Sequence, residues 1–74
     1  MPELDVGEVT LKDRRKRAGL TQAQLAGLVE VSRQTIIAIE RGDYSPSVYL
    51  ALRIARALDT TVEELFPLDR KDHS

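Results

Sequence analysis

The apolar positions of the chain recur at spacings of three and four residues between capping residues, a pattern that predicts a series of short helices. A first helix is expected from Leu11 to about Ala18, where Gly19 ends it. A second begins after Thr21, whose hydroxyl forms a capping box with Gln24. No segment shows the sustained alternation of a half-buried strand, so the chain is expected to be all-α.

Two further helices follow from the same signals. Ser32 is a good N-cap for a third helix that runs through Arg41 to a stop at Gly42, and Ser47 caps a fourth helix that extends to Leu58. The fourth helix is expected to lie at the centre of the core because its apolar residues cover most of its circumference. These residues are Val48, Ala51, Leu52, Ile54, Ala55 and Leu58.

The last expected helix is the shortest and starts from Thr60, in a capping box with Glu63, before Pro67 closes it. Residues 1–9 are expected to form an N-terminal arm, either without structure or with a short edge strand, and residues 68–74 a polar tail. The predicted fold class is therefore a compact five-helix bundle with one domain over residues 10–67.

Composition then excludes several classes of function. The 74 residues contain no cysteine and a single histidine, His73, which lies in the polar tail. The usual nucleophiles, general bases and metal ligands are therefore missing, and we expect no enzymatic activity, no metal and no cofactor. Residues 1–9 carry three acids and no base, unlike a secretory signal, and no apolar run approaches the ~18 residues of a membrane helix. A cytoplasmic protein is expected.

Charge is distributed unevenly although the net charge is only −1. Residues 10–41 hold seven bases and three acids, a balance of +4, whereas residues 1–9 carry −3 and residues 42–74 carry −2. This segment indicates a local anion-binding surface. A solvated helix face is the alternative explanation of its basic run.

The expected third helix has two different faces. Ile36, Ile39 and Glu40 share the inner face, whereas the outer face is polar or small and apolar, with Arg33, Gln34, Ile37, Ala38 and Arg41. Two short consecutive helices with a tight connection, the second presenting such a face, are typical of a helix-turn-helix.

The segment from Gly19 to Leu52, GLTQAQLAGLVEVSRQTIIAIERGDYSPSVYLAL, resembles the phage-repressor and Cro type of helix-turn-helix, the Xre family. The resemblance extends from about residue 11 to residue 66 and is strongest to small stand-alone regulators such as the cytolysin-operon repressor. It implies that Ala26 allows the two helices to approach each other, and that Val31 and Ile36 pack beneath the recognition helix. Most members have a glycine at the turn, where this chain has Glu30.

Groove chemistry assigns base-reading roles to the outer face of this helix. Arg33 suits a bidentate contact with guanine and Gln34 a contact with adenine, each worth about 1 to 3 kcal/mol of discrimination. Ile37 and Ala38 suit thymine methyl groups, although partial core packing is an alternative for Ile37.

The resemblance also implies contacts with the DNA backbone. Gln22 matches the position whose amide holds a phosphate, assisted by the positive end of its helix, although an ordinary helix-start residue is the alternative. Thr35, Arg41 and Tyr44 resemble the other backbone-contacting positions. Asp43 stands where a base is common and is expected to weaken those contacts.

Arg15 and Glu40 lie on the inner stripes of their helices, where an unpaired charge is costly. We therefore expect a structural ion pair between them, which the resemblance also implies.

The predicted function is a sequence-specific regulator of transcription, a repressor that binds a palindromic operator in double-stranded DNA as a homodimer, with no membrane and no small-molecule ligand among its partners. The apolar end of the chain, Leu65, Phe66 and Leu68, is the expected dimer contact, although core packing explains the first two equally well. The alternative function is a protein-interaction module, such as an antitoxin-like partner protein. A bundle without any DNA role is disfavoured by the polar outer face of the third helix.

Overall fold

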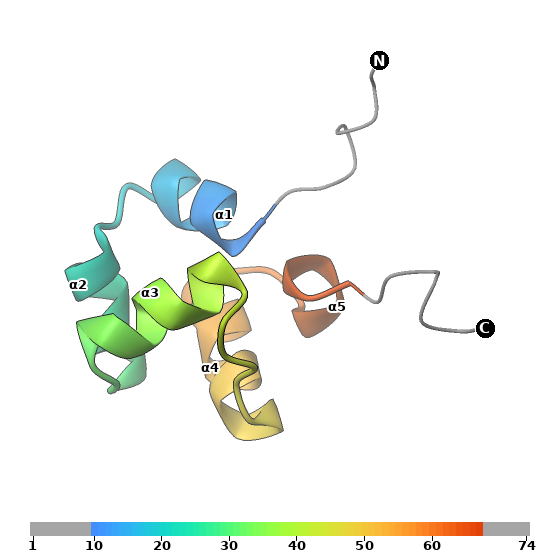
Figure 1. Ribbon diagram of the computed structural model, residues 1–74. Helices are drawn as coiled ribbons and strands as arrows, with labels where there is room; N and C mark the ends of the chain where they lie inside the picture. The colour runs from blue at the N-terminus through green and yellow to red at the C-terminus, as the bar shows by residue number, and fades with distance from the viewer. Residues whose placement is uncertain (1–9, 68–74) are drawn as a thin grey trace, which may run out of the picture.

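The computed structural model describes residues 10–67, and within this range it contains five α-helices and no strand (Figure 1). The helices are α1 (Leu11–Arg17), α2 (Gln22–Val29), α3 (Arg33–Arg41), α4 (Val48–Ala57) and α5 (Val62–Leu65). The predicted all-α, five-helix class is confirmed. The expected arm with its edge strand, the polar tail and His73 all lie outside the described residues. No helix in residues 10–67 has the length and apolar character needed to cross a bilayer.

Each helix begins at a hydroxyl side chain that accepts a hydrogen bond from the backbone three residues on. The predicted caps Thr21, Ser32 and Ser47 are confirmed. At Thr21 the capping box is complete, since its Oγ1 accepts the Gln24 N–H at 3.0 Å and its own N–H donates to the Gln24 side chain at 2.8 Å. Short polar side chains thus set the helix starts locally, before any packing is considered.

The start of α5 differs from the prediction by one residue. Thr61, not Thr60, is the N-cap, and it accepts the Glu64 N–H at 3.2 Å. The N–H of Thr60 is already used, because it closes the end of α4 by donating to the Ala55 carbonyl at 2.9 Å. Asp59 makes this closure possible by adopting a left-handed conformation with φ 56°.

The core lies where α2, α3 and α4 meet. Leu25, Ile36 and Ile54, one from each helix, are completely buried, and Val29 is 2% exposed. From the end of the chain, Leu65 is also buried and Phe66 packs against the core. Of the two interpretations of Leu65 and Phe66, dimer contact and core packing, the structure favours core packing. Leu68 lies outside the described residues.

The fourth helix is buried on one side only, which corrects the expectation that its apolar residues all face the core. Val48 and Leu52 are exposed, at 76% and 55%, together with Tyr49. Leu50, which the periodicity did not single out, is buried instead. The physical reason is that only one face of α4 packs into the core shared with α2 and α3, through Leu50, Ile54 and Ala55.

The turn between α2 and α3 is closed by a non-glycine residue in a left-handed conformation. Glu30 has φ 62° and ψ 44°, and the next residue, Val31, donates its N–H to the Ala26 carbonyl at 3.0 Å. This conformation costs a residue with a Cβ about 1 kcal/mol relative to glycine. The Glu30 carboxylate lies 3.2 Å from the guanidinium of Arg53 on α4, an ion pair that joins the turn to α4.

Candidate nucleic-acid interface

The first turn of α3 projects two polar side chains away from the bundle. Arg33 and Gln34 are both exposed, directly after the cap at Ser32. The inner face of the same helix is anchored by Ile36 and Ile39, which are buried in the core. The outward direction of the two polar residues is thus set by helix period and by the burial of the opposite face. In Figure 1, α3 runs across the front of α4, with its outer surface uncovered by another helix.

The remaining base-reading candidates are less exposed. Ile37 and Ala38 are half-buried, as is Thr35, whose hydroxyl lies 3.0 Å from that of Ser32. Half-burial leaves part of the Ile37 and Ala38 side chains open to solvent. For Ile37 it also gives partial packing, so both of its interpretations remain compatible with its position.

Arg15 and Glu40 lie together beneath this surface as a buried ion pair. Arg15 Nε donates to Glu40 Oε2 at 2.7 Å and Nη2 donates to Oε1 at 3.2 Å, with side chains only 8% and 4% exposed. A third donor, Arg15 Nη1, reaches the Leu20 carbonyl at 2.8 Å. The pair ties the end of α1 to the last turn of α3 and satisfies both charges.

The charge of Glu40 is stabilised by its partners. Burial by itself raises the pKa of this carboxyl group, but hydrogen bonds from Arg15 and Gln22 and the positive charge of Arg15 act in the opposite direction. The pKa of Glu40 consequently lies below its ordinary value of 4.5.

Gln22 connects the ion pair with the outer surface, a contact that the sequence pattern did not predict. It is half-buried at the start of α2. Its Nε2 donates to Glu40 Oε1 at 3.1 Å, and its Oε1 accepts from Arg33 Nη2 at 3.4 Å. Nothing in the spacing of these residues signals the contact, because it depends on how α2 crosses α3.

The end of α3 and the following loop are open to solvent. The side chain of Arg41 is 72% exposed and lies 3.5 Å from the carboxylate of Asp43, which is 62% exposed. Tyr44 is 49% exposed. The Asp43 carboxylate thus offsets part of the positive charge of Arg41, in line with the expectation that Asp43 weakens backbone contacts there.

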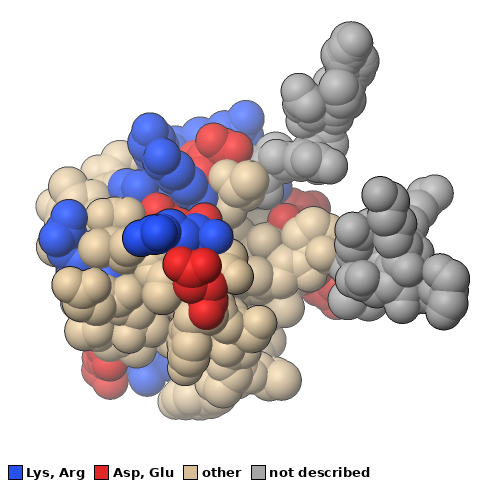
Figure 2. Space-filling model, in the orientation of Figure 1, with Lys and Arg blue, Asp and Glu red and all other residues tan. Residues whose placement is uncertain are grey.

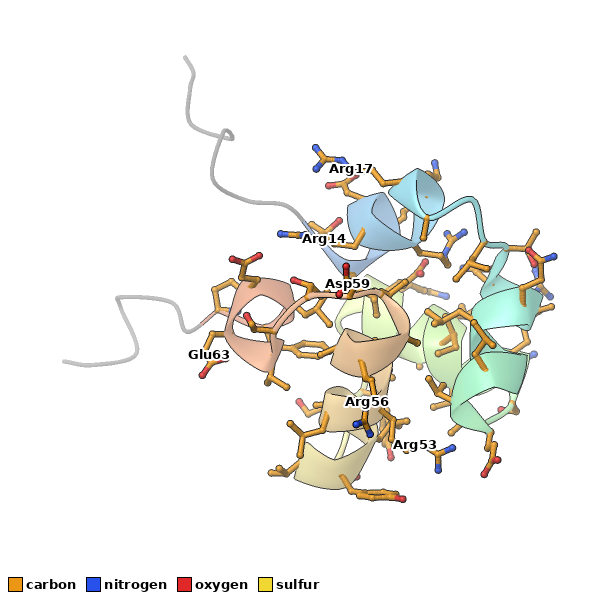
Figure 3. The ribbon with its side chains drawn as sticks, turned by 180° about the vertical axis from the view of Figure 1, so that it is seen from behind. Arg14, Arg17, Arg53, Arg56, Asp59 and Glu63 are labelled. Carbon is orange, nitrogen blue, oxygen red and sulfur yellow. The ribbon has the colours of Figure 1, made fainter. Side chains whose placement is uncertain are left out.

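Basic side chains gather on the side of the molecule that carries α1 and α3 (Figure 2). On α1 the exposed cations are Lys12, Lys16 and Arg17, while Arg14 is half-buried and pairs with Glu64 of α5. Two further arginines, Arg53 and Arg56, lie on α4, which faces the viewer when the molecule is seen from behind (Figure 3). The exposed bases of residues 10–41 therefore lie on α1 and α3, the same side of the molecule that carries Arg33.

Residues 11–65 match the helix-turn-helix family, which covers nearly all of the described chain. An uncharacterized HTH-type transcriptional regulator of Methanothermobacter thermautotrophicus is 57% identical over 60 residues, which span 80% of this chain and 87% of that protein. The uncharacterized HTH-type transcriptional regulator YgzD of Bacillus subtilis is 44% identical over 62 residues, 84% of this chain and 94% of that protein. Similarity to these relatives thus extends over most of their length.

Solved structures show the same fold. The restriction-modification controller protein C.AhdI of Aeromonas hydrophila superposes with a TM-score of 0.71 at 35% identity, over 85% of this chain and 90% of its own. Hydroxypropylphosphonic acid epoxidase from S. wedmorenis also matches, with a TM-score of 0.71 at 34% identity, but this chain spans only 30% of that enzyme's length.

The relatives matched over nearly their whole length are regulators rather than enzymes, which agrees with the composition. The chain belongs to the Xre-type helix-turn-helix family of DNA-binding transcriptional regulators.

Proposed function

We propose that this chain is a sequence-specific repressor of transcription that binds a palindromic operator as a homodimer, with α3 in the major groove. The observation that carries the proposal is the exposure of Arg33 and Gln34 on the first turn of a helix whose opposite face is anchored in the core. The major groove of B-DNA admits one α-helix and presents a distinct donor and acceptor pattern for each base pair. A helix whose first turn presents a guanidinium and an amide suits that pattern.

In this proposal the contacts divide into those that read bases and those that hold the backbone. Arg33 donates to guanine and Gln34 pairs with adenine, while Ile37 and Ala38 meet thymine methyl groups. The backbone contacts come from residues on both sides of α3, namely Gln22, Thr35, Arg41 and Tyr44. Repression then requires only occupancy, because a protein seated in the groove excludes other proteins from the same stretch of DNA.

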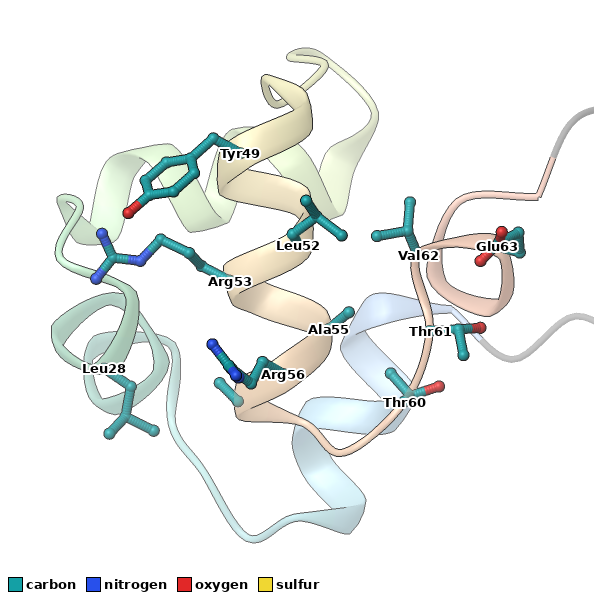
Figure 4. A pocket seen from close by; sticks show the side chains of 11 residues that line it. Leu28, Tyr49, Leu52, Arg53, Ala55, Arg56, Thr60, Thr61, Val62 and Glu63 are labelled. Carbon is teal, nitrogen blue, oxygen red and sulfur yellow. The ribbon is translucent and has the colours of Figure 1, made fainter.

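The homodimer is proposed to form through the exposed apolar side of α4. A groove between α4 and α5 opens there, and Leu52 and Val62 point toward each other across it (Figure 4). Its lining includes Leu28 and Tyr49, which are 57% and 69% exposed. A cluster of large exposed apolar side chains in so small a domain is typical of an interface.

Charge favours a second copy of this chain as the occupant of the groove. Arg56 on α4 and Glu63 on α5 lie on opposite flanks, and neither has an ion-pair partner among residues 10–67 (Figure 4). A two-fold axis along the groove brings each copy's Arg56 to the partner's Glu63. Two reading helices about 34 Å apart then match the two halves of a palindrome.

The same apolar surface favours a second candidate function. A protein-interaction module of the antitoxin-like kind would use the groove of α4 and α5 for a different protein and would not need Arg33 to meet a base. The two functions differ in what the free chain does with DNA.

The experiment is selection of bound duplexes from a random library, followed by fluorescence anisotropy over a range of salt concentrations. A repressor is expected to enrich a palindrome, to show a steep salt dependence, and to prefer the selected site over random duplex by a factor above about a thousand. Enrichment of no sequence, together with a single protein that co-purifies with the chain, would instead establish the interaction module.

Replacing Leu52 with glutamate is expected to separate the dimer into monomers. The side chain is 55% exposed in the single chain, so folding tolerates the charge, whereas a two-fold interface buries it twice. We expect the dimer dissociation constant to rise by about 100-fold or more in sedimentation equilibrium. Gln24→Glu, which adds the same charge at an exposed position outside the groove, serves as the control and leaves the dimer intact. Equal dissociation of both variants would exclude this face as the interface.

A further inference from the structure

We propose that Glu40 is a positioning residue for base reading, which acts through Gln22 on Arg33. Its carboxylate holds the Gln22 amide in one orientation, and that amide in turn restrains the guanidinium of Arg33 before DNA is bound. The inference rests on the proposed function for the role of Arg33, and it adds residues behind the surface that determine how strictly one base pair is discriminated.

The hydrogen bonds form a continuous chain from the core to the surface. Glu40 Oε1 accepts from Arg15 Nη2 at 3.2 Å and from Gln22 Nε2 at 3.1 Å. Gln22 Oε1 then accepts from Arg33 Nη2 at 3.4 Å. Solvent exposure of the side chains increases along this series of hydrogen bonds, from the buried Glu40 through the half-buried Gln22 to the exposed Arg33. These hydrogen bonds thus link a carboxylate anchored in the core to an exposed cation at the surface.

Electrostatics select one orientation of the amide between these two charges. The NH₂ group of Gln22 faces a carboxylate and its carbonyl oxygen faces a guanidinium, so each end meets an opposite charge. Rotating the amide by 180° would place the oxygen against Glu40 and the NH₂ group against Arg33, with repulsion at both ends. The charge of Glu40 therefore determines which acceptor Arg33 finds.

This arrangement leaves the DNA-facing donors available. An NH₂ group has two hydrogens, and Gln22 uses one for Glu40, so the other remains for a phosphate. Arg33 uses one hydrogen of Nη2, and the guanidinium keeps one pair of N–H groups with the fork geometry that guanine O6 and N7 require. A side chain that is ordered in advance loses less rotamer freedom on binding, and a guanidinium held at one place tolerates the wrong base less well.

If Glu40 were only structural and Gln22 only bound phosphate, substituting them would change DNA binding in a different way. Loss of a phosphate contact weakens binding about equally on all sequences, whereas loss of positioning lowers the preference for the base pair that Arg33 reads. The two roles are therefore separable by comparing the correct site with a site changed at that one base pair.

The first arm of the test uses the free protein, in which ¹⁵N relaxation of Arg33 Nε–Hε reports the order of its side chain. Gln22→Ala and Glu40→Gln are expected to lower the order parameter of this group. Glu64→Gln is the matched control, because it removes a carboxylate charge that holds Arg14 and has no contact with Gln22, and it is expected to change nothing. An Arg33 order parameter that is the same in the parent and in either Gln22→Ala or Glu40→Gln overturns the proposal, whatever the protein does with DNA.

The second arm uses the selected operator and a duplex changed at the base pair that Arg33→Ala identifies. Gln22→Ala is expected to lower the ratio of the two affinities by about 3- to 10-fold, part of the value of one bidentate contact. In an Arg33→Ala background the same substitution is expected to leave the ratio unchanged. Uniform weakening with an unchanged ratio in both backgrounds overturns the positioning role. If the parent protein selects no operator, the proposed function fails, and the relaxation arm still decides whether the chain of hydrogen bonds orders Arg33.

Discussion

Replacing Glu40 with alanine is expected to lower the free energy of unfolding by about 3 to 5 kcal/mol. The substitution leaves the Arg15 guanidinium, 8% exposed, without the carboxylate that accepts two of its hydrogen bonds. An unpaired buried charge is much more costly than the loss of one contact. For a domain of this size the loss is a large share of the total stability. Urea denaturation at neutral pH, followed by circular dichroism, measures it.

The control is Glu64 of α5, whose carboxylate pairs with Arg14 of α1. Glu64→Ala removes the partner of Arg14, but the Glu64 side chain is 56% exposed, so we expect a loss of no more than about 1 kcal/mol. Equal losses for Glu40→Ala and Glu64→Ala would mean that Arg15 finds water or another partner when its carboxylate is removed.

The same ion pair predicts how stability depends on pH. The pKa of Glu40 lies below its ordinary value of 4.5 in the folded chain, because hydrogen bonds from Arg15 and Gln22 outweigh burial. A carboxyl group with a lowered folded pKa stabilises the fold above its unfolded pKa, and this contribution is lost as the pH falls through the folded pKa. The parent protein is therefore expected to lose stability below about pH 4.5 more steeply than Glu40→Gln. Parallel profiles for the two proteins would contradict the lowered pKa.

The double substitution Arg33→Ala, Gln34→Ala is expected to abolish most of the selectivity of DNA binding while the protein remains folded. Both side chains are exposed, so the bundle does not need them. Each contributes about 1 to 3 kcal/mol of discrimination at one base pair in the proposed mode. Competition anisotropy with the selected operator and with duplexes changed at single positions measures the loss, and the preference should disappear at the base pairs these residues read.

Arg41→Ala serves as the contrasting variant, since Arg41 is proposed to meet the backbone. It is expected to weaken binding about equally on all duplexes and to reduce the salt slope by about one. Because Asp43 lies close to Arg41, the loss of affinity is expected to be smaller than for an arginine without an acidic neighbour. Unchanged base preferences in the double variant would show that Arg33 and Gln34 do not read the operator.

Much of the fold could be predicted from local chemistry. Thr21, Ser32 and Ser47 cap their helices because a hydroxyl before a helical segment satisfies a backbone N–H whatever the tertiary context. Gly42 ends α3 because glycine adopts φ 82° without steric cost. The helix period likewise predicted that Ile36 is buried and that Arg33 is exposed, and each is found so.

Local chemistry was insufficient where two neighbouring residues are equivalent or where burial depends on a distant element. Thr60 and Thr61 are the same residue type, and only the closure of α4 on the Thr60 N–H makes Thr61 the cap. Leu52 is as apolar as the buried residues of α4, yet it is 55% exposed because it lines the open groove toward α5 and does not pack into the core.

The sequence therefore determined the starts of α2, α3 and α4, the glycine stop of α3 and the two faces of α3, since these depend on residues within one or two turns of the chain. Tertiary structure alone decided which outward faces meet. The crossing of α2 over α3 brings Gln22 into contact with both Glu40 and Arg33, and residues 11 and 18 positions apart meet only because the two helices pack at one angle. The apolar groove likewise depends on how α5 packs beside α4, because its lining combines Leu52 of α4 with Val62 of α5.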